Sequence, residues 1–134
     1  MKYKALCEHH LFGKVYAANN RVTTQTVTVF VLADKHASRL RKENPEKEKI
    51  NRVGIVASKK LGGAVLRNRA RRVIRRAFWE IENETPLVKG KLIVITAREP
   101  LVSGSKLTKG ATVVKTQKVR HDIEKALRRL HMIP

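Results

Sequence analysis

The chain has 134 residues, and its 42% hydrophobic and 31% charged content is compatible with one folded domain spanning residues 1–134. Its formal net charge is +19, from 30 Lys and Arg against 11 Asp and Glu. Such an excess repels itself in the isolated protein and is best explained by a nucleic-acid partner. No stretch approaches the roughly 20 apolar residues of a membrane span, so we expect no membrane segment.

The N-terminal segment and the single cysteine favour a cytoplasmic protein. The segment that starts at Met1 lacks the apolar run and the small-residue cleavage site of a signal peptide. Cys7 has no second cysteine with which to form an internal disulfide. We therefore expect Cys7 to be a small apolar residue in a reducing compartment.

The first third of the chain predicts a helix and then a strand. Residues from about Glu8 to Ala18 form a short amphipathic pattern, and Thr23 to Ala33 is rich in β-branched residues. In this strand the valines alternate with a second set, and we expect the valines to face the core and the second set to face a wet, ligand-binding side. The second set is Thr26, Thr28, Phe30 and Leu32. Asp34 to Lys49 reads as a solvated loop.

The rest of the chain predicts two more strands and two more helices. Arg52–Ser58 and Lys91–Ala97 are expected as strands, with Lys59–Gly63 as a turn into a helix that runs from Ala64 to about Glu82. After a loop at Ser103–Ala111, a last helix is expected from about Val114 to His131. The order αββαβα indicates an α+β fold, a small sheet with helices packed on it. The two strands around the central helix are expected to be parallel neighbours.

The central helix carries the strongest functional signal. No acidic residue occurs between Asn51 and Trp79. A helical projection places apolar residues on one side and arginines on the opposite arc. The apolar set is Leu66, Ala70, Val73, Ile74, Ala77, Phe78 and Ile81, and the arginines are Arg67, Arg69, Arg71, Arg72, Arg75 and Arg76. Because a guanidinium holds two phosphate oxygens in a fixed geometry, this row indicates RNA or DNA binding from a structured helix.

No catalytic or metal-binding constellation is predicted in the protein itself. Metal-dependent nucleases gather several carboxylates, whereas Asp122 and Glu124 are two residues apart on a helix and diverge. His9 and His10 are neighbours on a helix, also diverge, and have no partner at metal-ligand spacing. His121 is expected on the surface.

The segment Arg52–Phe78 resembles the signature of the bacterial ribonuclease P protein subunit. That signature is a Val-Gly strand, Ser-Lys-Lys, a glycine turn, and then Ala-Val-x-Arg-Asn-Arg-x-(Lys/Arg)-Arg-x-x-Arg, all in the order found here. The resemblance is strong over residues 52–78 and looser over nearly all the rest of the chain. One departure is Gly62-Gly63, where the family often has Gly-Asn.

The resemblance implies a ribonucleoprotein endonuclease that removes the 5′ leader from precursor tRNA. It implies that the RNA subunit carries catalysis with magnesium, that the protein binds no cofactor itself, and that its partners are the catalytic RNA and precursor tRNA. It also implies a left-handed βαβ crossover, against the general right-handed rule. The implied contacts to the catalytic RNA are Lys59, Lys60, Arg67, Asn68, Arg69, Arg71, Arg72 and Arg75. The implied cleft for the single-stranded leader contains Phe12, Tyr16, Thr28 and Phe30.

Other interpretations remain open at this point. A structural or ribosomal RNA-binding protein would share the charge and the sheet, although not the arginine motif together with the aromatic residues. A membrane-active or calmodulin-binding helix would also be basic and amphipathic. Phe12, Tyr16 and Phe30 could simply pack the first helix on the sheet.

Overall fold

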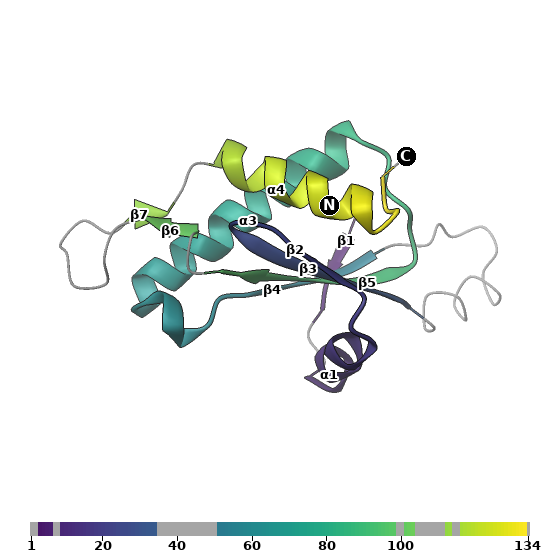
Figure 1. The fold of residues 1–134 in the computed structure, drawn as a ribbon, viewed down its shortest axis with the longest axis horizontal. Coiled ribbons are helices and arrows are strands. Elements are labelled where there is room, and N and C mark those ends of the chain that lie inside the picture. The colour runs from purple at the N-terminus through teal and green to yellow at the C-terminus, as the bar shows by residue number, and fades with distance from the viewer. Residues whose placement is uncertain are drawn as a thin grey trace.

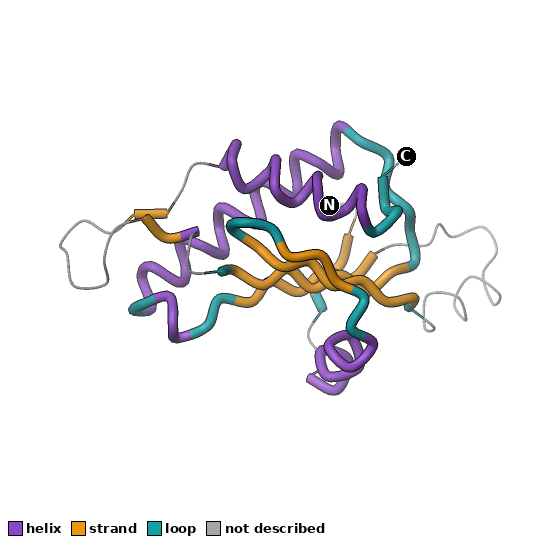
Figure 2. The backbone as a smooth tube through the Cα atoms, viewed as in Figure 1, coloured by secondary structure: helices purple, strands orange, loops and turns teal. Residues whose placement is uncertain are grey.

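A mixed sheet separates one helix from two others in this protein (Figure 1). The computed structural model describes residues 3–6, 9–34, 51–98, 101–103, 112–113 and 116–133. Helix α1 (His9–Ala18) lies on one face of the sheet, and helices α3 (Ala64–Glu84) and α4 (Thr116–Arg129) lie on the other (Figures 1 and 2). A short 3-10 helix, η1 (Lys59–Leu61), precedes α3.

The main sheet has five strands in the order β1-β4-β5-β3-β2. Strands β1 (Tyr3–Ala5), β4 (Asn51–Val56) and β5 (Lys91–Ala97) run parallel to one another. Strand β3 (Val27–Ala33) is antiparallel to β5, and β2 (Arg21–Thr23) is antiparallel to β3. The predicted parallel pairing of the strands around the central helix is confirmed, and the left-handed sense of this crossover remains an expectation.

The predicted elements agree with the structure except at the sheet edges. The helix bounds and β5 differ by a few residues at most from the sequence prediction. The strand predicted from Thr23 to Ala33 is confirmed as β3 from Val27 onward, whereas residues 24–26 form the turn from β2, and neither β2 nor β1 was predicted. The small pair β6 (Val102–Ser103) and β7 (Thr112–Val113) was also missed. Most of the two predicted loops, residues 35–50 and 104–111, lies outside the described residues.

The main core lies between the sheet and the pair α3 and α4. Val27, Val29 and Val31 are buried there, as the alternation in this segment predicts. They pack with Ile93 and Ile95 of β5 and with the apolar side of α3. This face is continuous from strand to strand because alternate residues of each strand point to the same side.

A smaller core lies on the opposite face, beneath α1. It contains Leu6, Val15, Phe30, Leu92 and Val94. The expectation that Phe30 faces a wet surface is therefore wrong, because α1 covers it and leaves only 6% of the residue exposed. The physical reason is that a helix and a sheet each have one apolar side to bury, and α1 uses this face.

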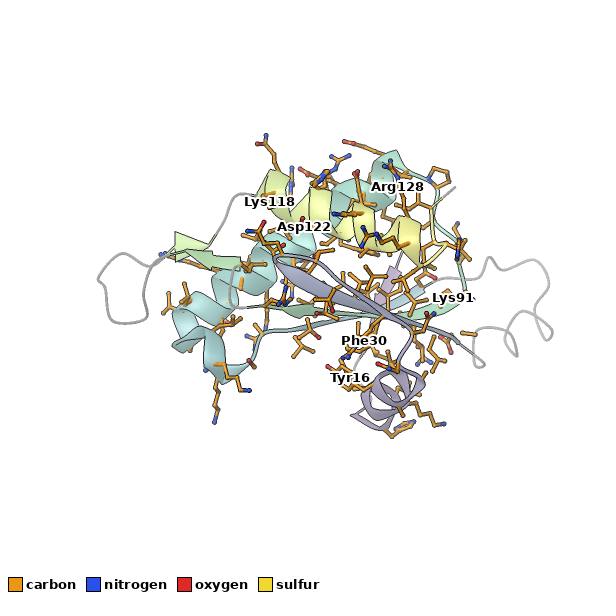
Figure 3. All side chains as sticks on the ribbon, viewed as in Figure 1. Tyr16, Phe30, Lys91, Lys118, Asp122 and Arg128 are labelled. Atoms are coloured by element: carbon orange, nitrogen blue, oxygen red, sulfur yellow. The ribbon has the colours of Figure 1, made fainter. Side chains whose placement is uncertain are left out.

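Thr26 also departs from its predicted place on the wet face. It precedes β3 and is buried, and its hydroxyl donates to Asp122 Oδ2 of α4 at 2.5 Å. The Thr26 backbone N–H donates to the same oxygen at 3.2 Å. Lys118 Nζ lies 3.3 Å from Asp122 Oδ1, so the buried carboxylate has both a cation and hydrogen-bond donors. Asp122 thereby fixes α4 to the β2–β3 turn (Figure 3).

Candidate RNA-binding surface

The outward side of α3 presents arginines that no other described residue pairs. Arg69, Arg72 and Arg75 are exposed. Within the described residues they make no hydrogen bond or ion pair. The opposite side of the same helix holds it in place, because Ala70, Ile74 and the residues following them on that side are buried in the main core. The helix is thus a rigid support for guanidinium groups that remain free to bind an anion.

Arg67 and Arg71 do not lie on the arc opposite the core, where the helical projection placed them. Both are half-buried. Arg67 is seven residues before Ile74, nearly two full turns, so the two side chains leave the helix from the same side. Within the described residues, Arg67 Nε is buried without a hydrogen-bond partner. These two arginines border the apolar side of α3, next to the end of β4.

Contacts within the motif orient Arg71. Its Nη1 donates to Asn68 Oδ1 at 2.8 Å, and its Nη2 donates to the carbonyl oxygen of Ala57 at 3.4 Å. Asn68, which lies among the free arginines in sequence, therefore acts in this structure as an acceptor that holds Arg71. The bond to Ala57 turns the Arg71 guanidinium toward the residue that follows β4.

The approach to α3 is also basic. Lys59 and Lys60 are exposed on η1. Gly62 has φ of 137°, a backbone conformation that favours glycine, and Gly63 caps α3 without a side-chain hydrogen bond. The first turn of α3 contains no acidic residue. Its N-terminal N–H groups and the two lysines therefore add to the positive potential at this end of the helix.

On the other face of the sheet, Tyr16 and Phe30 meet between α1 and β3 (Figure 3). Their ring centroids are 4.8 Å apart and the rings are nearly perpendicular, at 86°. Tyr16 is 39% exposed, whereas Phe30 is buried. The guanidinium carbon of Arg21, the cross-strand neighbour of Phe30, lies 5.8 Å from the Phe30 ring centroid. Tyr16 and Arg21 thus reach the surface above a buried ring. Arg21 was missed from the sequence because β2 was not recognised as a strand.

Phe12 packs α1 against the sheet at a glycine of β4. A Cβ atom at Gly54 would lie 2.6 Å from two atoms of the Phe12 ring. Only a residue without a side chain lets the ring lie this close to β4. Phe12 is half-buried, so its environment supports the packing interpretation.

A row of threonines crosses the sheet on the same face as Phe30. Thr28 is the register partner of Thr23 on one side and of Thr96 on the other. Thr28 Oγ1 donates to Thr23 Oγ1 at 3.4 Å. Thr28 and Thr96 are half-buried, and Thr96 Oγ1 has no hydrogen-bond partner in the described structure. The row adjoins Val56, two residues before Ser58 and η1, so hydroxyls lie on this face near the start of the basic segment.

Three acidic residues of the helices, Glu80, Glu84 and Glu124, pair with one arginine of α4. Arg120 on α4 pairs with Glu124 on its own helix, Nε to Oε1 at 2.9 Å, and with Glu80 on α3 at 3.6 Å. It also pairs with Glu84. The hydrogen bond from Arg120 lowers the pKa of the Glu84 carboxyl, and the same bond raises the pKa of Arg120. These acids fasten α3 to α4 and do not gather around an empty space.

The described residues lack both a candidate metal site and a candidate membrane-spanning helix. Within these residues, no group of three or more His, Cys, Asp or Glu side chains could hold a metal ion. Nor does this part of the chain contain a helix that is both long and apolar enough to cross a membrane.

Comparisons with known proteins give one result. The sequence model of the family Ribonuclease P matches residues 1–131. A ribonuclease P protein component of Bacillus velezensis is 32% identical over 99 residues, which are 74% of this chain and 73% of that protein. One from Bacillus cereus is 47% identical over 49 residues, 37% of this chain and 41% of that protein.

Solved structures agree with this result. A Staphylococcus aureus RNase P protein superposes with a TM-score of 0.65 and 25% identity, covering 99% of this chain and 100% of that chain. The Thermotoga maritima RNase P protein has a TM-score of 0.68, covers 94% of this chain and 96% of that chain, and at 21% identity supports the fold. The family match over nearly the whole chain, together with these relatives, shows that the chain belongs to the ribonuclease P protein family.

Proposed function

We propose that this protein is the RNA-binding subunit of a ribonuclease P ribonucleoprotein that removes the 5′ leader from precursor tRNA. The observation that carries the proposal is the outer side of α3, where Arg69, Arg72 and Arg75 are exposed on a helix whose opposite side is fixed in the core. A rigid row of guanidinium groups suits the phosphates of a folded RNA. In this proposal α3 docks on the catalytic RNA.

The same contact extends toward the end of β4 through Arg67, Arg71, Lys59 and Lys60. A phosphate oxygen near Arg67 would give its buried Nε the acceptor that the described residues do not provide. Asn68 acts through Arg71, whose guanidinium it orients.

The sheet face beside α1 is proposed to hold the single-stranded leader. Tyr16 supplies an exposed ring on which a base can stack, and Arg21 supplies a cation for the backbone. Thr28, together with the other threonine hydroxyls of its row, supplies hydrogen-bonding groups beside it. Phe30 and Phe12 have supporting roles. Phe30 packs beneath Tyr16, and Phe12 packs α1 against Gly54.

The chemical step is assigned to the RNA subunit, with magnesium ions bound by that RNA and no cofactor bound by the protein. The family resemblance supports this division of labour, in which the protein contributes binding and orientation of the substrate. The proposal places the protein in the cytoplasm together with its RNA.

Reconstitution with a bacterial ribonuclease P RNA at low magnesium concentration tests the proposal. Addition of the protein should restore specific cleavage of precursor tRNA under conditions in which the RNA alone is inactive. Single-turnover measurements should also show tighter binding of precursor tRNA than of mature tRNA, which has no leader. Tight RNA binding with no effect on cleavage would contradict the proposal and would favour a structural RNA-binding protein.

A further inference from the structure

The outer side of α3 carries an aromatic residue that the core does not use. Trp79 is the only tryptophan in the chain and is 40% exposed. Its neighbour in sequence, Phe78, is fully buried in the main core, so the helix already has its aromatic anchor on the other side. A single exposed apolar residue is common on protein surfaces, and exposure alone gives Trp79 no role.

The position of Trp79 distinguishes it from an ordinary exposed residue. It is seven residues after Arg72 and four after Arg75, so it projects from the same side of α3 as these free arginines. The ring therefore continues the row of guanidinium groups by one further turn of the helix. Its neighbours toward the N-terminus of the helix are cationic, as a polyanion would require, whereas Glu80 and Glu82 follow it.

A guanidinium group also holds the ring in place. The Cζ atom of Arg76 lies 4.8 Å from the Trp79 ring centroid, within the range of a cation–π contact. Arg76 Nε is in turn 3.2 Å from Glu80 Oε1. The stack of Arg76 on Trp79 is thus fixed from the next turn of the helix.

We propose that Trp79 and Arg76 form a platform on which an unpaired base of the bound RNA stacks. This inference rests on the proposed docking of α3 on the catalytic RNA and extends it from phosphate binding to base contact. Proteins recognise unpaired RNA bases by stacking them on aromatic rings and on the planes of arginine side chains. The charge of the surrounding row favours RNA as the occupant over an apolar protein surface.

The platform should contribute affinity without contributing charge, and this property makes it testable. Trp79→Ala should weaken binding of a bacterial ribonuclease P RNA by about tenfold, because the base loses its aromatic support. The slope of affinity against salt should remain at the wild-type value, because no positive charge is removed. Trp79→Phe should retain part of the affinity, and Val88→Ala should leave it unchanged, as Val88 is an apolar residue of similar exposure outside α3.

Fluorescence of the wild-type protein provides an independent reading, because Trp79 is its only tryptophan. Saturation with the RNA should quench the fluorescence of Trp79 and reduce its further quenching by acrylamide. Unchanged fluorescence and an unchanged affinity of Trp79→Ala, with RNA binding by the wild-type protein intact, would overturn the platform and leave the proposed function standing. Absence of RNA binding by the wild-type protein would overturn both. Fluorescence that depends on protein concentration without RNA would overturn the platform in favour of self-association.

Discussion

Arginines in two regions of the described structure differ in the partners that the protein gives them. Beside Asp34 and along the contact between α3 and α4, arginines have acceptors from the protein. Arg52 binds both oxygens of Asp34, at 2.7 and 2.9 Å, and Arg120 is surrounded by Glu80, Glu84 and Glu124. On the outer side of α3, Arg69, Arg72 and Arg75 have none among the described residues.

This difference separates residues that hold the fold from residues available to a partner. A guanidinium that already donates to a carboxylate has little to gain from a phosphate, whereas an unpaired one can release counterions from RNA on binding. The net charge of +19 therefore does not tell which of the cations are available to bind RNA. Three changes test this distinction. Each should alter either RNA affinity or stability of the fold and leave the other unchanged.

The largest effect is expected from Arg69→Ala, Arg72→Ala and Arg75→Ala combined. RNA affinity should fall on the order of 100-fold at moderate salt, and the salt slope should decrease by about three, since three phosphate contacts are lost. Thermal stability should change little because these side chains are exposed. Fluorescence anisotropy with labelled RNA over a series of salt concentrations measures both quantities.

A matched control removes the same charge from a different helix. Lys125→Ala, Arg128→Ala and Arg129→Ala combined also delete three exposed cations, from the outer side of α4. This variant should retain most of the affinity. An equal loss in both variants would mean that RNA responds to net charge alone, and the outer side of α3 would not be the docking surface.

The second prediction concerns the paired charges. Asp122→Ala should destabilise the protein by about 3 kcal/mol, because it leaves the buried N–H and hydroxyl of Thr26 without their acceptor. Urea unfolding measures the loss. RNA affinity of the folded fraction should equal that of the wild type. Asp122→Asn should restore part of the stability, since its amide oxygen can still accept from Thr26. Equal stability of Asp122→Ala and wild type would contradict the anchoring role.

The smallest effect is expected from Glu84→Gln, and it depends on pH. The bond from Arg120 lowers the folded-state pKa of Glu84 below its ordinary value of 4.5. Ionised Glu84 therefore stabilises the folded protein above about pH 4.5, and this contribution is lost as the pH falls through the folded-state pKa. The wild type should have a slightly higher Tm than Glu84→Gln at pH 7, and the difference should vanish in acid. Because Glu84 is exposed, 1 M salt should also reduce it.

Local patterns predicted the elements that bury a periodic apolar side, and they failed where a distant segment decides the environment. Helix α3 and strand β5 follow from periodicity and from a continuous apolar run. Phe30 was placed on a wet face because the alternation of β3 does not reveal that α1 covers it. The bond between Thr26 and Asp122 joins residues 96 positions apart, and nothing near either residue signals it.

The site was predictable to a similar extent. The arginine row was found from its sequence, yet Arg67 and Arg71 were assigned to the wrong side because the width of the apolar side of α3 was underestimated. Tyr16 is exposed as a base-stacking residue must be, and Phe30 is not. Arg21 and Trp79 have no motif of their own. Arg21 is identified by the pairing of β2 with β3, and Trp79 by its contact with Arg76.

The central place of β5 has a consequence for how the protein forms on the ribosome. Both β3 and β4 pair with β5, so the strands encoded in the first 56 residues have no common partner until residues 91–97 have left the exit tunnel. Contacts this distant in sequence close slowly. Until β5 is present, β4 and β3 can pair only with their outer neighbours β1 and β2, so the basic helix has no continuous sheet to pack on. Completion of β5 is therefore the step that joins the two halves of the sheet beneath α3.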